Sequence, residues 1–517
     1  MTAVGTGAMR FGAGALTFAL DEVGLSFLVL FAFLWTLSGA YAWVSVPVAE
    51  RGRFFAWYAP SAVGGIAVAL TADAVSFYLC FALMALPSWG LVTHARTAES
   101  RRAGAIYLTL TVLGEALLLG GMMLLAARAG SLELGALRDA AAASPLALGM
   151  VVGAIALKIG SLPASGVLPL TYVHAPAGAA SALAGASVKV GALAMLRLLP
   201  FGSGLAEWQT ALVVLGVATA FGAAILGVLT TSPRAVLGYS SASQMGLVTI
   251  AAGVGLGSPE AAALATGAIV GYSLHHGLAK SALVLGDDVV GRLAGRGRTL
   301  ALAVLVLPAL ALVGAPLTSG FVAKYALKDA VHAMAGPLGH TVEALLPWMA
   351  VATAALMLRF LSLVRGRETD SARADRGTGA LWAMLLVAVA LACWLWPAEW
   401  ARHAIESAFK PASMWAAVWP ALVAGAGALA VVRAVRSQGL RRGIVPPGDL
   451  LTFGASLAAQ APHPRERSAT RGDGPFRRFA DALTNAALYG EARLIAWSVA
   501  GIVFVALVIV VALLVTG

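Results

Sequence analysis

The feature that most constrains this chain is its succession of apolar runs. Each is about 20 residues long, the length that a helix needs to cross roughly 30 Å of hydrocarbon. The 517 residues are 60% hydrophobic and only 11% charged, a balance outside the range of soluble domains. Lipid satisfies no backbone polar group, and the runs are too long for barrel strands, so each run must be a helix. The sequence therefore predicts an all-α polytopic membrane protein.

About fourteen such runs follow one another along the chain. They lie near 24–46, 55–72, 73–93, 104–127, 146–171, 179–199, 208–229, 235–256, 261–286, 299–330, 345–364, 379–397, 413–434 and 494–516. Short loops join the runs from 24 to 434. We therefore expect one continuous helical domain up to that point.

Basic residues gather on alternate loops. One side holds Arg51, Arg53, Arg96, Arg101, Arg102, Arg234, Arg292, Arg296, Arg298, Arg365, Arg367, Arg373 and Arg376. The other side holds only Arg10, Arg128, Arg138, Lys328, Arg402 and Lys410. The positive-inside rule makes the first side cytoplasmic, and an even number of spans puts both termini outside. The net charge of +11 thus reflects orientation in a prokaryotic cytoplasmic membrane and does not indicate a nucleic-acid partner.

Composition divides the chain into segments. We expect an outside N-terminal segment at 1–23, a main domain at 24–400, a further transmembrane helix at 413–434, a cytoplasmic linker at 435–493 and a last transmembrane helix at 494–517. The linker is polar and rich in arginine. Its end, Phe476–Arg493, fits an amphipathic interfacial helix or, alternatively, a disordered loop.

Two of the spans contain helix-breaking residues. The fifth carries Pro163 shortly after a lysine, and the tenth carries Pro316 shortly before one. Proline removes a backbone donor and crowds the preceding turn, so we expect a break in both helices. Paired broken spans are typical of inverted repeats with a site at the break. We therefore predict two inverted five-helix repeats, near 55–199 and 208–364.

Lysine is scarce, and most of it lies in the predicted membrane. Of 35 basic residues six are lysine, and four of these lie six or more residues inside a span: Lys158, Lys189, Lys280 and Lys324. Arginine stays charged in a protein, whereas a buried lysine can gain and lose a proton near neutral pH. Snorkelling to the interface is the alternative, strongest for Lys280, which lies near a span end. Because ionisable groups within a membrane usually mark ion paths, we expect these lysines to carry protons.

Few other ionisable groups lie as deep. Glu115 is in the middle of its span, and we pair it with Lys158, since a nearby carboxylate holds a lysine protonated. Its alternative role is a packing hydrogen bond. His276 and Lys280 are four residues apart and so share a helix face, with Tyr272 one turn earlier. These three side chains can form a relay, or they can be ordinary satisfied polar groups.

Several motifs in order resemble the antiporter-like proton-channel subunits of respiratory complex I, Mrp-type cation/proton antiporters and group-4 membrane-bound hydrogenases. The motifs are "TFALDEVGLSFLVLFAF", "RRAGAIYLTLTVLGEALLL", "LKIGSLPASGVLPLTYVHAPAGAASALAGASVKVGALAMLR", "TTSPRAVLGYSSASQMGLV", "HHGLAKSALVLG" and "GAPLTSGFVAKYAL". The third resembles most the large membrane subunit of hydrogenase-4 and formate hydrogenlyase. The resemblance covers about residues 20 to 400.

The resemblance implies a role for each matched residue. Lys158 matches the lysine of the broken helix that is central to proton transfer, and Lys189 the lysine that some members carry on the next helix. His276 and Lys280 match the histidine and lysine of the connecting path, with His275 beside them. Lys324 matches the terminal lysine or glutamate from which the proton leaves.

The chain departs from the family in two places. The family pattern "WELMSLxSY" holds a glutamate that modulates the broken-helix lysine, but this chain reads "FALMALPSW", with Ala82 at the matching position. We expect Glu115 to take over that role. The chain also begins at what resembles the third family helix, so we expect a neighbouring membrane subunit to cover the face of the first two.

We thus predict a proton-translocating, or sodium-translocating, subunit of a multisubunit energy-coupling complex, with a cytoplasmic or peripheral catalytic module as a partner. We expect no cofactor or metal in the chain itself, because its sequence offers no cysteine cluster, no nucleotide loop and few histidines. The alternatives are the ion-conducting subunit of an inorganic-carbon uptake complex or of an Mrp-type antiporter. A non-conducting structural scaffold is the alternative of a different class.

Overall fold

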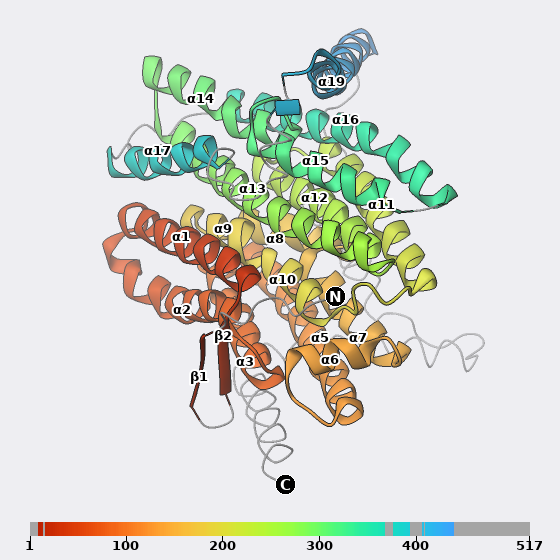
Figure 1. Cartoon of the computed structure of the whole chain (residues 1–517). Coiled ribbons are helices and arrows are strands. Elements are labelled where there is room, and N and C mark those ends of the chain that lie inside the picture. Colours follow the sequence, from red (N-terminus) through yellow and green to blue (C-terminus); the bar gives the residue numbers. More distant parts are fainter. Residues whose placement is uncertain are drawn as a thin grey trace, which may run out of the picture. The chain divides into compact units, whose positions relative to one another are not determined.

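The computed structural model describes residues 9–13, 16–334, 336–367, 376–392, 406–407 and 409–438. Helices make up nearly all of this part of the chain, and one short hairpin is added to them (Figure 1). The all-α prediction is therefore confirmed in its main feature. The predicted interfacial helix at Phe476–Arg493 and the last predicted span, 494–516, lie outside the described residues.

The hairpin precedes the first helix and was not predicted. It pairs β1 (Met9–Ala13) with β2 (Leu16–Leu20). Phe18 also forms an isolated bridge with Thr71, and the Thr17 amide donates to the Asp73 carboxylate at 2.6 Å. Both partners lie more than fifty residues away along the chain, so a reading of local sequence could not supply them.

The first helix, α1 (Glu22–Ser45), begins at Asp21, whose carboxylate accepts from the Gly24 amide at 2.6 Å. Arg197 from a distant helix donates to the same carboxylate at 2.8 Å. Burial alone would raise the pKa of Asp21, but the Arg197 guanidinium and the helix amide outweigh it and hold that pKa below its usual value. The pair fixes one end of α1 against the middle of the chain.

The remaining helices follow in two groups. The first group is α2 (Val48–Ala67), η1 (Val68–Leu70), α3 (Ala74–Ala85), α4 (Ser88–Val92), α5 (Ala98–Ala129), α6 (Leu134–Ala141), α7 (Pro145–Ile159), η2 (Ala164–Gly166), α8 (Val167–His174), α9 (Ala177–Ala182), η3 (Leu183–Ser187) and α10 (Lys189–Leu198). The second group is α11 (Ala206–Leu229), α12 (Pro233–Gly255), α13 (Pro259–Arg292), α14 (Gly295–Val313), α15 (Ser319–His332), α16 (Pro337–Arg365), α17 (Arg376–Leu391) and α19 (Pro411–Gln438).

Caps explain where several of these helices begin. Ser232 and Ser258 precede α12 and α13, and each side chain accepts a hydrogen bond from a first-turn amide. A proline follows each serine at the first helical position, where its missing N–H costs nothing. Both start sites are thus encoded in the sequence itself.

Within the described residues, eight helices are long and apolar enough to cross a membrane, or nine if the bent pair α6 and α7 counts as one span. The protein is therefore a multi-pass membrane protein. Each predicted span up to 434 overlaps a helix, but the number fourteen and the five-helix repeats remain predictions. The short amphipathic helix α6 was not predicted, because its eight residues are fewer than a span requires.

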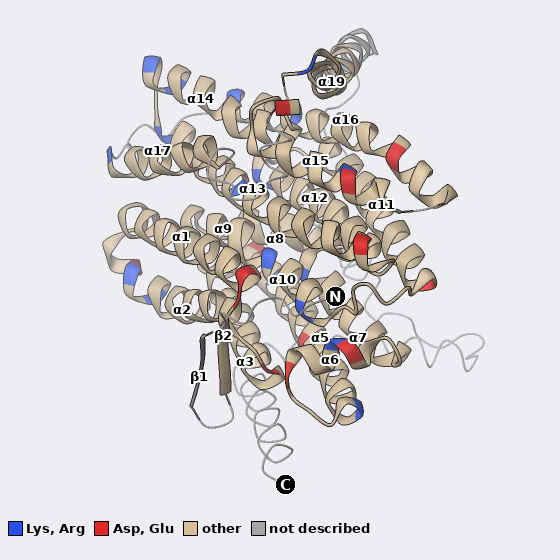
Figure 2. Cartoon of the chain, viewed as in Figure 1, with Lys and Arg blue, Asp and Glu red and all other residues tan. Residues whose placement is uncertain are grey.

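The central helices differ from the outer ones in their burial. The hydrophobic part of the α9–α10 segment is wholly buried, and so is every residue of α12 from Ala235 to Gly255. A helix enclosed by protein need not be apolar all round, so it can carry polar side chains at membrane depth. Figure 2 shows charged residues at scattered positions on otherwise uncharged helices. Part of the candidate site lies on these enclosed helices, and Glu115 lies on the less buried α5.

Candidate functional site

The first broken helix ends earlier than its proline suggested. Helix α7 stops at Ile159, and Gly160 caps it in the left-handed conformation with φ of +70°. Only glycine adopts this geometry without strain. Pro163 comes three residues later and precedes η2 and α8. The prediction of a break is confirmed, but the glycine ends the helix and the proline only keeps the next segment from joining it.

Lys158 lies in the last turn of α7, next to this break. Its Nζ donates to Ser187 Oγ at 3.1 Å and lies 5.3 Å from the centre of the Phe81 ring. Both contacts favour an ammonium group, one through a hydroxyl lone pair and the other through the face of an aromatic ring. The three groups come from α7, η3 and α3, so the lysine sits where separate segments converge.

A cavity of about 50 Å³ lies beside the lysine. Lys158 and Glu115 both line it, and its other polar lining consists of the hydroxyl-bearing residues Tyr107, Thr111, Thr171, Tyr172 and Ser187. A cavity needs roughly 10–15 Å³ of this kind of volume to hold one water molecule. The space is therefore large enough for water between the carboxyl and amino groups.

Glu115 is 4% exposed, and neither of its carboxylate oxygens has a hydrogen-bond partner among the described residues. It interacts electrostatically with Lys158. Leaving a buried carboxyl group without any polar partner is costly, so its position on a polar cavity with a lysine is the feature that offsets the cost. Both residues thus line one cavity, and their pairing in proton transfer stays a prediction.

Ala82 stands on α3, where it is 1% exposed. Its neighbours Phe81 and Ala85 line the cavity, and Ala82 itself does not. Helix α3 therefore reaches the cavity without contributing a carboxylate. The acid at this cavity comes from α5 in the form of Glu115.

Lys189 follows a short π-helical turn, η3, which interrupts the buried α9–α10 segment. Its Nζ donates to the Ala184 carbonyl at 2.6 Å, and the side chain is fully buried. Gly185 and Gly277 let η3 approach α13 closely, since a Cβ on Gly277 would lie 2.8 Å from the Gly185 carbonyl oxygen. The π-turn frees a carbonyl for the lysine, and the glycines bring the segment against α13.

Helix α13 carries the predicted central group. Lys280 Nζ donates to the Leu237 carbonyl of α12 at 3.0 Å, and His275 Nδ1 lies 2.9 Å from Ser319 Oγ. His276 is fully buried, and neither ring nitrogen has a hydrogen-bond partner in the described part of the chain. Lys189 interacts electrostatically with His275, His276 and Lys280. The structure therefore brings these four residues together.

The Tyr272 hydroxyl does not bond His276 or Lys280, the residues with which the sequence grouped it. It donates to Gln244 Oε1 of α12, and Gln244 Nε2 donates in turn to Thr353 Oγ1 of α16 at 2.8 Å. The Tyr272 ring still lies beside both histidines, with centroids 6.0 Å from His275 and 6.4 Å from His276. This arrangement fixes the ring orientation and makes Tyr272 a support for the histidines.

The second broken helix repeats the glycine cap. Helix α14 ends at Val313, and Gly314 follows with φ of +89°. Pro316 lies in the gap before α15 begins at Ser319, so the break predicted here is also present. Lys324 Nζ donates back to the Val313 carbonyl at 2.5 Å. Because His275 bonds Ser319, the first residue of α15, the central group is tied directly to this break.

Sequence reasoning missed the neutral partners. Ser187, Ser319, Gln244 and Phe81 each hold or orient one of the predicted groups. Serines and phenylalanines are common in membrane helices, so their spacing gives no signal. Gln244 is different, because an amide in the middle of an apolar span is costly and could have been singled out.

The comparison with known families settles the class of this chain. A family model described as "NADH:quinone oxidoreductase/Mrp antiporter, TM" matches residues 71–346, more than half of the sequence. The chain belongs to this family. The matched stretch contains Glu115, Lys158, Lys189, Lys280 and Lys324.

Relatives were also found among curated proteins and solved structures. Two uncharacterized proteins of Mycobacterium tuberculosis, from two strains, are each 30% identical over 345 residues, 61% of this chain and 53% of theirs. The structure of the Mrp complex from Dietzia sp. DQ12-45-1b matches with a TM-score of 0.71 at 21% identity, covering 99% of this chain and 57% of that one. The chain thus spans about half the length of these relatives. The structural match supports the fold of an antiporter-like membrane subunit.

Proposed function

We propose that this subunit moves protons across the membrane through a chain of ionisable groups. Of these groups, Glu115, Lys189, His276 and Lys280 are buried, and Lys158 and Lys324 are half-buried; His275 and Tyr272 are supporting members. Membership of the family is consistent with ion translocation. What we add to family membership is that the ion is the proton and that these residues carry it.

One observation carries the proposal. Glu115 and Lys158 line the same cavity at the point where α7 breaks. An acid and a base that share a space large enough for water can exchange a proton, and each charge stabilises the other while both are ionised. When the separation of the two groups changes, the lysine releases its proton.

Electrostatic contacts extend this exchange across the bundle. Lys158 bonds Ser187 at the end of η3, and Lys189 begins α10 two residues later. Lys189 interacts with the His276 and Lys280 group, and His275 interacts with Lys324. A positive charge on one member disfavours a positive charge on the next, so a proton that arrives at one end favours release at the other.

We further propose that the subunit works within a larger complex. One solved structure with a similar fold is that of an Mrp complex from Dietzia, and this supports other membrane subunits as neighbours here. A peripheral catalytic module, as in hydrogenases, is the alternative source of energy for the protons. The arginine-rich loops support a cytoplasmic-membrane location with those loops facing the cytoplasm.

Replacement of Lys158 by methionine tests the function. The complex purified with this chain, reconstituted in liposomes, should lose coupled proton uptake by about a thousandfold, since removal of one proton carrier typically costs 10²–10⁴. The matched control is Lys328→Met, because Lys328 lies on α15 with its side chain 60% exposed. The control should pump at the wild-type rate. Unchanged uptake in Lys158→Met would contradict proton translocation by this path.

A further inference from the structure

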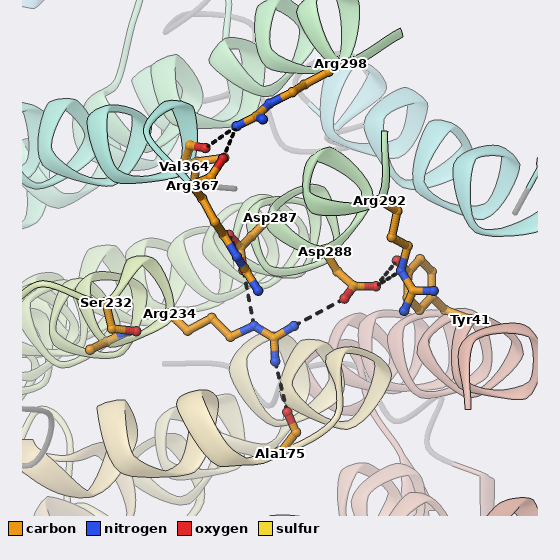
Figure 3. Close-up of polar contacts among 11 residues, drawn as sticks. Tyr41, Ala175, Ser232, Arg234, Asp287, Asp288, Arg292, Arg298, Val364 and Arg367 are labelled. Atoms are coloured by element: carbon orange, nitrogen blue, oxygen red, sulfur yellow. Dashed lines mark hydrogen bonds and ion pairs between the residues drawn. The ribbon is translucent and has the colours of Figure 1, made fainter. Parts of the chain in front are cut away.

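An ion-paired network at the end of α13 takes no part in the proposed path (Figure 3). Asp287 is fully buried, and Asp288 follows it shortly before the helix ends at Arg292. Arg234, at the start of α12, lies between the two acids. Its Nε is 3.2 Å from Asp287 Oδ2, and its Nη2 is 3.6 Å from Asp288 Oδ1.

The remaining donor of Arg234 fixes a third segment. Its Nη1 donates at 3.0 Å to the carbonyl of Ala175, in the corner between α8 and α9. That corner leads into the segment that carries Lys189. One guanidinium group therefore joins α12, α13 and the start of α9.

The two acids face different neighbours. Both oxygens of Asp287 lie 3.4 Å from Nη1 of Arg367, which follows α16. Arg298 holds the same segment by donating to the Arg367 carbonyl at 2.6 Å. Asp288 instead accepts from Tyr41 of α1 and from Arg292, each at 2.7 Å. Figure 3 shows Arg234 extended between Asp287 and Asp288.

Position on the helix separates Asp287 from Asp288. At about 100° per residue, His276, Lys280 and Asp287 fall within about 40° of one another, whereas Asp288 lies about 100° further round. Asp287 is about 10 Å along the axis from Lys280. Leu283, fully buried, occupies the same face between them.

Helix α12 makes the matching contacts in the same order. Its Leu237 carbonyl accepts from Lys280, and Arg234, three residues earlier, pairs with Asp287. The Arg234–Asp287 pair thus joins α12 to α13 at a point nearer the arginine-rich side of the membrane than Lys280 is. A guanidinium at this point is charged at any accessible pH and repels a proton that approaches from that side.

We propose that Arg234 and Asp287 form a charge lock that closes the path at Lys280 toward the arginine-rich side of the membrane. The two residues act as positioning residues for Lys280, and the lock rests on the proposed function only in assuming that Lys280 can carry a proton. The Arg234–Asp287 contact holds α12 against α13 beside Lys280 and needs both charges, so the lock opens when either residue is neutralised.

Passive proton flux tests the lock without any turnover. The full-length chain, purified with its associated subunits and reconstituted in liposomes, is given a potassium diffusion potential, and an enclosed pH-sensitive dye reports the flux. Asp287→Asn should raise passive flux at least about tenfold over wild type. Adding Lys280→Met to Asp287→Asn should return the flux to the wild-type level, because the leaking proton loses its carrier. A packing defect would leak with or without Lys280.

The neighbouring acid provides the matched control. Asp288→Asn removes a carboxylate that also pairs with Arg234 but lies on another face, so its flux should stay within about twofold of wild type. Arg234→Gln probes the same lock from α12 and should leak like Asp287→Asn, which covers the case in which one variant does not fold. Tight vesicles with both lock variants, or a leak that persists without Lys280, would overturn the lock. The proposed function is tested by a different measurement: if it is wrong, Lys158→Met will show normal coupled proton uptake.

Discussion

The two broken helices are built alike but hold their lysines differently. Each first segment ends in a left-handed glycine, Gly160 or Gly314, with a proline in the following gap. Lys158 comes before its break and bonds a serine hydroxyl on another segment. Lys324 comes after its break and bonds the carbonyl that ends the preceding helix.

This difference matters for proton chemistry. A hydroxyl can accept from an ammonium group or donate to a neutral amine, whereas a carbonyl can only accept. The contact of Lys158 with Ser187 therefore suits both protonation states. Lys158 also borders the cavity with Glu115, and neither Gly314 nor Lys324 lines that cavity. We therefore propose that the first break serves a change of charge and that the second stabilises a charge at a helix end.

Replacing Lys324 tests this contrast, and we expect it to lower coupled proton uptake more than replacing Glu115 does. We expect Lys324→Met to lower coupled proton uptake on the order of a hundredfold, the lower part of the range for removing a proton-transfer group. The loss should be smaller than with Lys158→Met, because the remaining path still contains the switching pair. Uptake by both variants is measured side by side in liposomes. Equal losses would mean that the two breaks play equivalent parts.

Neutralising Glu115 should have a smaller effect. An opposite charge near a titrating group commonly changes its protonation equilibrium by about tenfold or more, so Glu115→Gln should lower coupled turnover about tenfold. Adding Ala82→Glu should restore part of that rate, since it returns an acid to the α3 position beside the cavity-lining Phe81. Ala82→Gln in the same background is the size-matched control and should restore nothing. A wild-type rate in Glu115→Gln would exclude a modulating role for Glu115.

Much of the fold followed from simple rules. Apolar length located the helices, and the serine–proline pairs at Ser232 and Ser258 marked two of their starts. The β1–β2 hairpin was not predicted, because the residues that it contacts, Thr71 and Asp73, are distant in sequence. Whether buried helices such as α12 face lipid or protein depends on the neighbours they pack against, which no local pattern contains.

The sequence predicted the ionisable residues of the candidate site but not their neutral partners. Buried lysines and Glu115 stand out because ionisable groups in a membrane are rare and costly. Their partners did not stand out, because Ser187 and the backbone carbonyls of Ala184, Leu237 and Val313 look like any others. The Arg234 and Asp287 pair was missed for another reason: both residues lie near span ends, where charge is ordinary. Only the packing of α12 on α13 reveals that Asp287 is buried.

The most direct test of the central claim is proton uptake by Lys158→Arg. Arginine keeps the positive charge and much of the length of lysine but does not release its proton in a protein. If Lys158 must gain and lose a proton, the purified complex should keep its assembly and lose coupled proton uptake in liposomes. Uptake at the wild-type rate would show that only a fixed positive charge is needed at this position, and it would contradict the account.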